Sequence, residues 1–147
     1  PLECLMTSIS RPLRLGLIEL HCLQFGDDSE QLNPWRYMDG IIDWKDRLQD
    51  FSDTAHVVSQ LDLVICVDTA VAHLAGALNR PTWLLLPYNA DFRWLRDRTD
   101  SPWYPSMRLF RQTGRNDWSS VLMQLNTALD ELFQLNLASL AIAKGLK

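Results

Sequence analysis

Long apolar runs alternate with segments of helical periodicity along most of the chain, and the apolar runs end at polar residues. Residues 63–67 (LVICV) and 81–87 (PTWLLLP) lack the alternation of a half-exposed strand, which is typical of strands buried on both faces of a parallel sheet. Shorter apolar segments that finish near Phe25 and at residues 40–43 predict two more strands, and residues 107–112 (MRLFRQ) predict the last.

Three segments carry apolar residues at helical spacing. One follows Asp53, which we expect to be its N-cap, and a second, residues 69–78, is rich in alanine and leucine and ends before Pro81. The third begins at Asp117 or Ser119, either of which is a suitable cap. It presents one apolar stripe, made of Val121, Leu122, Leu125, Leu129 and Leu132.

Strands that alternate with helices, and that are continuously apolar, are typical of a parallel sheet covered by helices on both faces. No internal repeat or low-complexity linker divides the sequence. We therefore expect a single α/β domain over residues 1–147, a Rossmann-like three-layer sandwich with a mainly parallel sheet of about five strands.

The composition excludes several classes of function but does not identify one. A net charge of −4 gives no general attraction for nucleic acid or an anionic membrane, and no apolar run approaches the roughly 20 residues that span a bilayer. The three cysteines form no CxxC motif, so we expect reduced thiols in a cytoplasmic protein, with no metal site and no cofactor. The chain starts at Pro1 rather than at methionine, which favours a piece of a longer protein.

The junction between residues 63–67 and 69–78 is the best candidate for a binding site. Ligands of parallel α/β sheets bind beyond the carboxyl ends of the strands, where the first amides of a helix attract anions. Asp68 and Thr69 stand at that position, and the small Ala70 leaves room for a phosphate near the backbone. His73 lies one helical turn later on the same face as Thr69.

Two interpretations of this spacing stay open. Aspartate or threonine before a helix is often only an N-cap, and a lone histidine on a helix is usually structural. No GxGxxG or Walker loop accompanies the junction. Spacing alone therefore does not separate a phosphate site from ordinary helix capping.

Residues 61–87, LDLVICVDTAVAHLAGALNRPTWLLLP, resemble the donor-binding motif of bacterial heptosyltransferase-like glycosyltransferases. The order of features is the same as in that family: a strand, an acidic residue, a helix cap, a histidine and the turn that follows the helix. Residues 91–112 resemble more narrowly the branch in which such a domain follows tetratricopeptide repeats. The resemblance extends over roughly residues 20–135.

The resemblance implies a GT-B fold, of which this chain is the C-terminal, donor-binding half. The ligand would be a nucleotide-diphosphate sugar, and the N-terminal half and upstream repeats would lie outside this sequence. Asp68 would stand near the donor sugar or diphosphate, Thr69 and Ala70 would bind the phosphates, and His73 would lie beside them.

The same resemblance assigns Gln24, Gly26 and Asp27 to the region that lines the nucleoside pocket. The sequence departs from the family twice. Many relatives have glycine in place of Ala70, and repeat-fused relatives often have lysine in place of Phe25, so a cation of the site is missing here.

Residues 89–106 form a long segment that joins the last two predicted strands. Arg93 and Arg96 are candidate phosphate contacts, and Tyr88 or Trp94 is a candidate for stacking on a base or sugar. The other interpretation is that Trp94 and Trp103 only pin this segment onto the body of the domain.

The resemblance implies metal-independent glycosyl transfer, with the general base on the absent half, so we identify no catalytic residue in this chain and expect it to be inactive alone. A degenerate domain that serves as a protein-interaction module is one alternative, and a sugar-nucleotide epimerase is another. The uncovered face of such a half makes a homodimer of the fragment a further expectation.

Overall fold

The computed structural model describes residues 2–143, except for the side chains of Cys4 and of residues 135–143. Its five strands all run parallel but form two sheets rather than the single sheet expected from the sequence. The strands are β1 (Leu20–Cys22) and β2 (Ile41–Asp43) in one sheet, and β3 (Val64–Val67), β4 (Thr82–Leu86) and β5 (Met107–Arg111) in the other, in that order.

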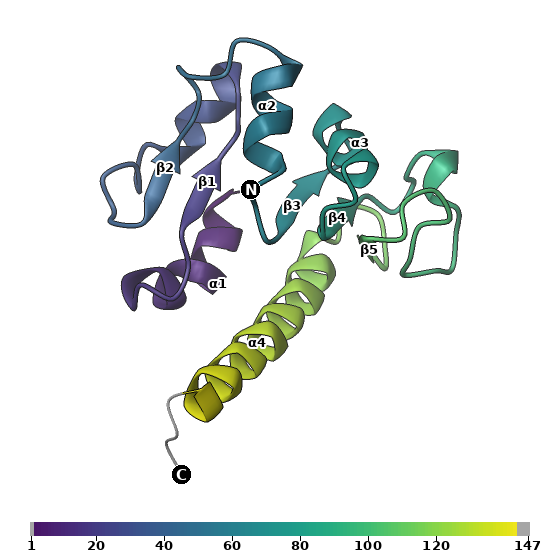
Figure 1. Cartoon of the computed structure of the whole chain (residues 1–147). Helices are drawn as coiled ribbons and strands as arrows, with labels where there is room; N and C mark the ends of the chain where they lie inside the picture. Colours follow the sequence, from purple (N-terminus) through teal and green to yellow (C-terminus); the bar gives the residue numbers. More distant parts are fainter. Residues whose placement is uncertain (1, 144–147) are drawn as a thin grey trace.

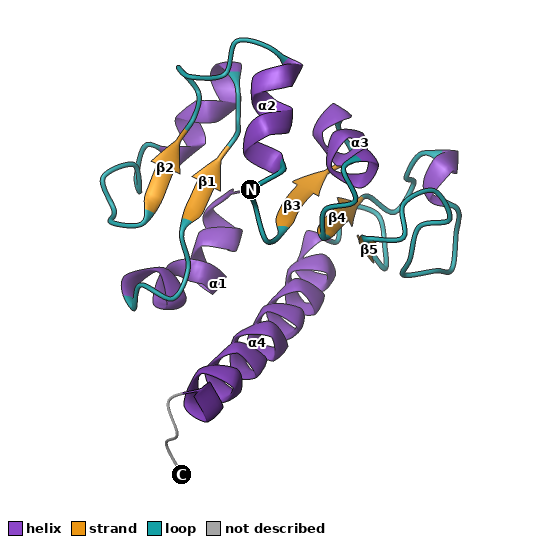
Figure 2. Ribbon diagram, viewed as in Figure 1, coloured by secondary structure: helices purple, strands orange, loops and turns teal. Residues whose placement is uncertain are grey.

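Helices cover both faces of the strands, as the three-layer prediction requires (Figures 1 and 2). They are α1 (Leu2–Arg14), α2 (Phe51–Val58), α3 (Ala70–Ala77) and α4 (Trp118–Ala143), with two 3-10 helices, η1 (Gly26–Leu32) and η2 (Phe92–Trp94). The Rossmann-like α/β class is therefore confirmed, whereas a continuous five-stranded sheet is not present among the described residues.

One face of both sheets packs against α1 and α4. Leu20 of β1 and Ile65 of β3 both contact this layer, which contains the buried residues Met6, Ile9, Leu13, Leu125 and Leu129. The two sheets thus share a core although no backbone ladder joins β1 to β3. Since β1 is three residues long, a ladder there would add few hydrogen bonds, and side-chain packing joins the sheets instead.

The opposite face packs against α2, α3 and part of the segment between β4 and β5. Val58 of α2 and Ala75 of α3 cover β3, and Ala72 of α3 covers β4. Small alanines let α3 lie close to the sheet, which holds its first turn at the carboxyl ends of the strands.

Two helix starts differ in detail from the prediction. Asp50, not Asp53, caps α2, because its carboxylate accepts hydrogen bonds from the amides of Ser52 and Asp53. At the start of α4, Asp117 accepts a hydrogen bond from the amide of Ser120, so the expected cap is present. No helix within the described residues is long and apolar enough to cross a membrane.

Candidate functional site

The start of α3 lies directly beyond the carboxyl end of β3. Thr69 occupies the N-cap position with extended backbone angles (φ −139°, ψ 172°), and its carbonyl accepts the first helical hydrogen bond from the amide of Ala72 at 3.0 Å. Its hydroxyl makes no capping bond to the helix amides and instead donates to the carbonyl of Val67 at 3.4 Å. The side chain is therefore not used in closing the helix.

This helix start is open to solvent. Thr69 and Ala70 are exposed, Asp68 is half-buried, and the preceding Val67 is 48% exposed. The amides of Ala70 and Val71 have no acceptor within the described part of the chain, as the geometry of a helix start requires. Two free N–H groups and the positive end of the α3 dipole thus face water beside a hydroxyl.

His73 lies one turn further along α3 and is half-buried. Its ring stacks on Trp94, with ring centroids 5.2 Å apart and an interplanar angle of 24°. Its Nδ1 lies 3.1 Å from the hydroxyl oxygen of Tyr104. These contacts hold the imidazole in one orientation next to the turn that carries Thr69.

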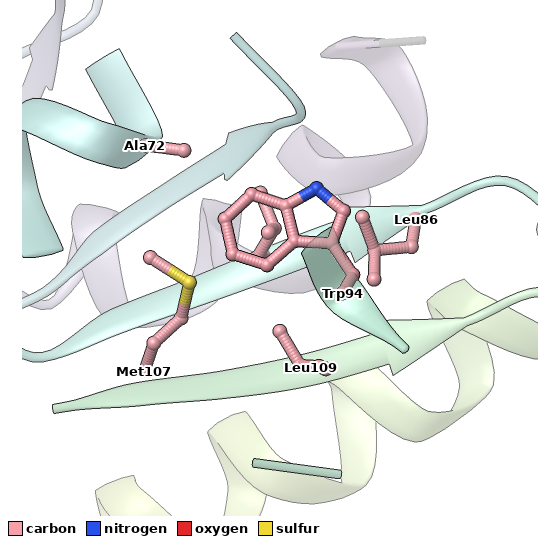
Figure 3. Close-up of a cluster of buried hydrophobic side chains, with 6 residues drawn as sticks. Ala72, Leu86, Trp94, Met107 and Leu109 are labelled. Carbon is pink, nitrogen blue, oxygen red and sulfur yellow. The ribbon is translucent and has the colours of Figure 1, made fainter. Parts of the chain in front are cut away.

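Trp94 is fully buried and lies in the core between α3 and the strands β4 and β5 (Figure 3). Its neighbours in this cluster are Ala72, Leu84, Leu86, Met107 and Leu109. With no exposed ring face, Trp94 has no surface for stacking on a base or sugar, which corrects that expectation. The buried ring of Trp94 attaches the segment between β4 and β5 to the core, as the other interpretation held for this residue. Trp103, the second tryptophan of that interpretation, is 63% exposed and donates from its indole nitrogen to the carbonyl of Arg93 within the same segment.

A charged side chain reinforces this attachment. The guanidinium of Arg111, at the end of β5, donates to the carbonyl oxygens of Trp94 at 3.1 Å and Leu95 at 2.7 Å. Burial lowers the pKa of Arg111, which nonetheless stays charged at neutral pH. Sequence reasoning missed both Arg111 and Tyr104, because only non-local contacts single them out.

Arg93 and Tyr88 lie on the surface of the same segment. Arg93 is exposed and pairs with Asp91 at 3.1 Å, so its charge is already partly balanced. Tyr88 is 49% exposed and borders a shallow hollow of about 280 Å³ beyond the ends of β4 and β5. Its amide donates to the buried Gln112 carboxamide at 3.0 Å, which fixes the loop.

The residues expected at a nucleoside pocket follow β1. Gln24 is half-buried and its carboxamide oxygen accepts a weak hydrogen bond from the Cys22 thiol at 3.7 Å. Gly26 begins η1 with φ +68°, and Asp27 follows it in an exposed position. Phe25 is 72% exposed. Because the strands are parallel, these residues share the carboxyl edge with Asp68, although they belong to the other sheet (Figure 2).

The electrostatic environment adds two constraints. Burial, with a smaller contribution from Asp68, raises the pKa of Cys66 to about 12, so this thiol stays protonated at neutral pH. Within the residues whose side chains are described, no group of three histidine, cysteine or acidic side chains is arranged to hold a metal ion. The polar groups at or near the start of α3 include backbone amides, the Thr69 hydroxyl and the His73 imidazole.

Residues 49–90 match the sequence model of the family described as glycosyltransferase family 9 (heptosyltransferase). Protein FlbA of Caulobacter vibrioides is 32% identical over 112 residues, which cover 73% of this chain and 18% of FlbA. The chain thus spans less than a fifth of the length of this curated relative. No solved structure matches the chain. The similarity to glycosyltransferases of family 9 falls on the segment that contains β3, the start of α3, and β4, and it supports a glycosyltransferase-like protein.

Proposed function

We propose that this chain is the nucleotide-diphosphate-sugar-binding, C-terminal half of a glycosyltransferase, with the N-terminal half and a region of tetratricopeptide repeats elsewhere in a longer protein. The observation that carries the proposal is the open start of α3. Its free amides and the hydroxyl of Thr69, which makes no capping hydrogen bond to the helix, lie inside the segment that matches the glycosyltransferase family.

In this proposal the diphosphate lies over the amides of Ala70 and Val71. Negative charge grows on the diphosphate as its bond to the sugar breaks, and prearranged donors that meet this charge lower the barrier. Thr69 adds a hydroxyl, His73 adds a ring N–H, and Asp68 orients the sugar. No metal ion takes part in this scheme, because the positive end of the helix and these donors meet the charge.

Nucleoside recognition is assigned to the carboxyl end of β1. Gln24 offers a carboxamide, and the positive φ of Gly26 turns the backbone there. Asp27 is exposed and accepts hydrogen bonds from a ribose or a base in this scheme. Tyr88 and Arg93, beyond β4, are the candidate contacts of the sugar side.

Calorimetric titration of the chain with UDP, ADP and GDP, with and without EDTA, tests the proposal. We expect one of the three to bind with a dissociation constant below the millimolar range, unchanged by EDTA and weakened in Thr69→Ala. The remote variant Thr127→Ala, on an exposed face of α4, is the matched control. If a folded sample binds none of the three at millimolar concentration, the proposal is wrong.

A second candidate function is a degenerate domain that acts as a protein-interaction module. The exposed Phe25 at the carboxyl end of β1 favours it, because a large apolar side chain there suits a protein contact better than a phosphate. Replacing Thr69 and His73 separates the two functions. A donor site loses nucleotide binding in these variants, whereas an interaction module keeps its partner.

A further inference from the structure

We infer that Tyr104 is a positioning residue for His73: its hydroxyl donates to Nδ1 of the imidazole and thereby keeps the ring proton on Nε2, where it can meet an anion at the start of α3. The identity of that anion rests on the proposed function, but the tautomer is a property of the chain alone.

The imidazole is held from two sides. Trp94 stacks on it at 5.2 Å, and Tyr104 meets it edge-on, with ring centroids 5.8 Å apart and an interplanar angle of 66°. The Tyr104 oxygen lies 3.1 Å from Nδ1, within hydrogen-bond distance. A partial rotation of the ring would break the stack, and a half-turn would replace Nδ1 by a carbon atom beside the tyrosine hydroxyl and so break the hydrogen bond.

The chemistry of the two groups sets the direction of this hydrogen bond. A neutral imidazole has one protonated and one unprotonated nitrogen, and the hydrogen bond made by one nitrogen decides which tautomer is present. A phenol is a better donor than acceptor, and an unprotonated ring nitrogen is a good acceptor. The favoured pair is therefore Tyr104 O–H to Nδ1, which leaves the proton on Nε2.

Tyr104 is itself fixed in place. Its amide donates to the Ser101 hydroxyl at 3.3 Å, and its carbonyl accepts from the amide of Met107, the first residue of β5, at 3.0 Å. Its ring occupies the space that a side chain on Gly76 would fill, since a Cβ there would lie 2.4 Å from the ring. The hydroxyl is thus positioned by the fold and not by the ligand.

The remaining ring nitrogen, Nε2, is available to the proposed ligand. Side chains of a helix tilt toward its N-terminus, so His73 covers the turn that begins at Thr69. Nε2 makes no hydrogen bond within the described part of the chain, whereas Nδ1 is engaged. An Nε2–H donor beside the free amides of Ala70 and Val71 adds to the same anion site.

The first test measures the tautomer by ¹⁵N NMR of the histidine rings in the chain without ligand, at a pH where imidazole is neutral. We expect His73 to show a protonated Nε2 and an unprotonated Nδ1, and Tyr104→Phe to shift both nitrogens toward a mixture of tautomers. Tyr37→Phe, at a position 94% exposed, is the matched control and leaves His73 unchanged. A protonated Nδ1 in the parent chain, or no change in Tyr104→Phe, would overturn the inference.

The second test measures affinity for whichever of UDP, ADP or GDP binds the parent chain. Tyr104→Phe keeps the ring against Gly76 but removes the hydroxyl, so we expect about a three- to tenfold loss of affinity without a comparable loss of thermal stability. Unchanged affinity alongside a changed tautomer refutes the positioning role. Absence of nucleotide binding by the parent chain refutes the proposed function, and the tautomer measurement still decides the first half of the inference.

Discussion

The ring of Tyr104 lies where a side chain on Gly76 would have to be: a Cβ at that glycine would fall 2.4 Å from Cγ of the tyrosine. Gly76 lies within a helix and is not among the glycines with positive φ. A glycine is therefore required here because it leaves room for the tyrosine ring and not because of its backbone conformation. The close approach attaches the segment between β4 and β5 to α3.

Gly76→Ala is therefore expected to destabilise the chain by about 1–3 kcal/mol, because the added methyl group displaces the Tyr104 ring. The free energy of urea unfolding measures this. Gly114→Ala is the matched control, since a Cβ there meets no atom within 4 Å. Equal stability of the two variants would show that the tyrosine ring moves freely.

Ala70→Asp separates helix stability from anion binding. A carboxylate in the first turn interacts favourably with the helix dipole, by about 0.3–1 kcal/mol, so the variant is expected to fold at least as well as the parent. The same charge repels a diphosphate, so nucleotide binding is expected to fall more than tenfold. Thermal unfolding and calorimetry together measure both effects, and undiminished binding would place the phosphates elsewhere.

Arg111→Met is expected to loosen the segment around η2. The substitution removes the charged group that donates hydrogen bonds to the carbonyl oxygens of Trp94 and Leu95. A hydrogen bond from a charged group contributes about 1.5–3 kcal/mol to stability before solvent screening and relaxation reduce it. Hydrogen exchange of the amides of residues 92–98 measures the effect. Arg115→Met, at an exposed position, is the control and leaves that exchange unchanged.

Asp117 predicts a pH dependence of stability. Hydrogen bonds from Ser119, Thr113 and Ser120 hold the pKa of this carboxyl well below its usual value, which is about 3.9 in an unfolded chain. The contribution is therefore fully present above that value and is lost as the pH falls toward the folded-state pKa. Asp117→Asn is expected to be less stable than the parent at pH 7.

The difference in melting temperature between the parent chain and Asp117→Asn, measured from pH 7 down to pH 3, checks the sign. The difference is expected to shrink as the pH falls below about 4, because the carboxyl of the unfolded parent chain then takes up a proton while the folded chain keeps its carboxylate, which favours unfolding. Asp130→Asn, an exposed carboxyl on α4, serves as the control. A difference that stays constant over this range would mean that the hydrogen bonds of Asp117 do not depend on its charge.

Local sequence predicted the central elements well. The buried run before Asp68 and the alanine-rich segment after it placed β3 and α3 within a residue of their observed ends. β3 is specified by short-range pattern, because a strand covered by helices on both faces is continuously apolar, and here only its last residue, Val67, is exposed. The helix start at Thr69 followed directly from that boundary.

The features that the sequence did not predict depend on contacts between distant residues. The helix α1 has apolar residues at helical spacing, but its burial against α4 is decided more than a hundred residues later in the chain. The roles of Trp94, Tyr104 and Arg111 likewise arise only when β4 and β5 bring their connecting segment over α3. A tryptophan in sequence looks the same whether it will stack on a ligand or fill a core.

The absence of a backbone ladder between β1 and β3 in the described chain has a consequence for selectivity. The residues proposed to recognise the base belong to one sheet, and those proposed to bind the phosphates belong to the other. The distance between these two groups of residues therefore depends on how Leu20 and Ile65 pack against the helical layer that the two sheets share. Substitutions that change the side-chain volume at those two positions are expected to shift one sheet relative to the other, since they leave every strand pairing intact. The spacing between the two proposed recognition regions would thereby depend on residues that face the helical layer on the other side of the sheets.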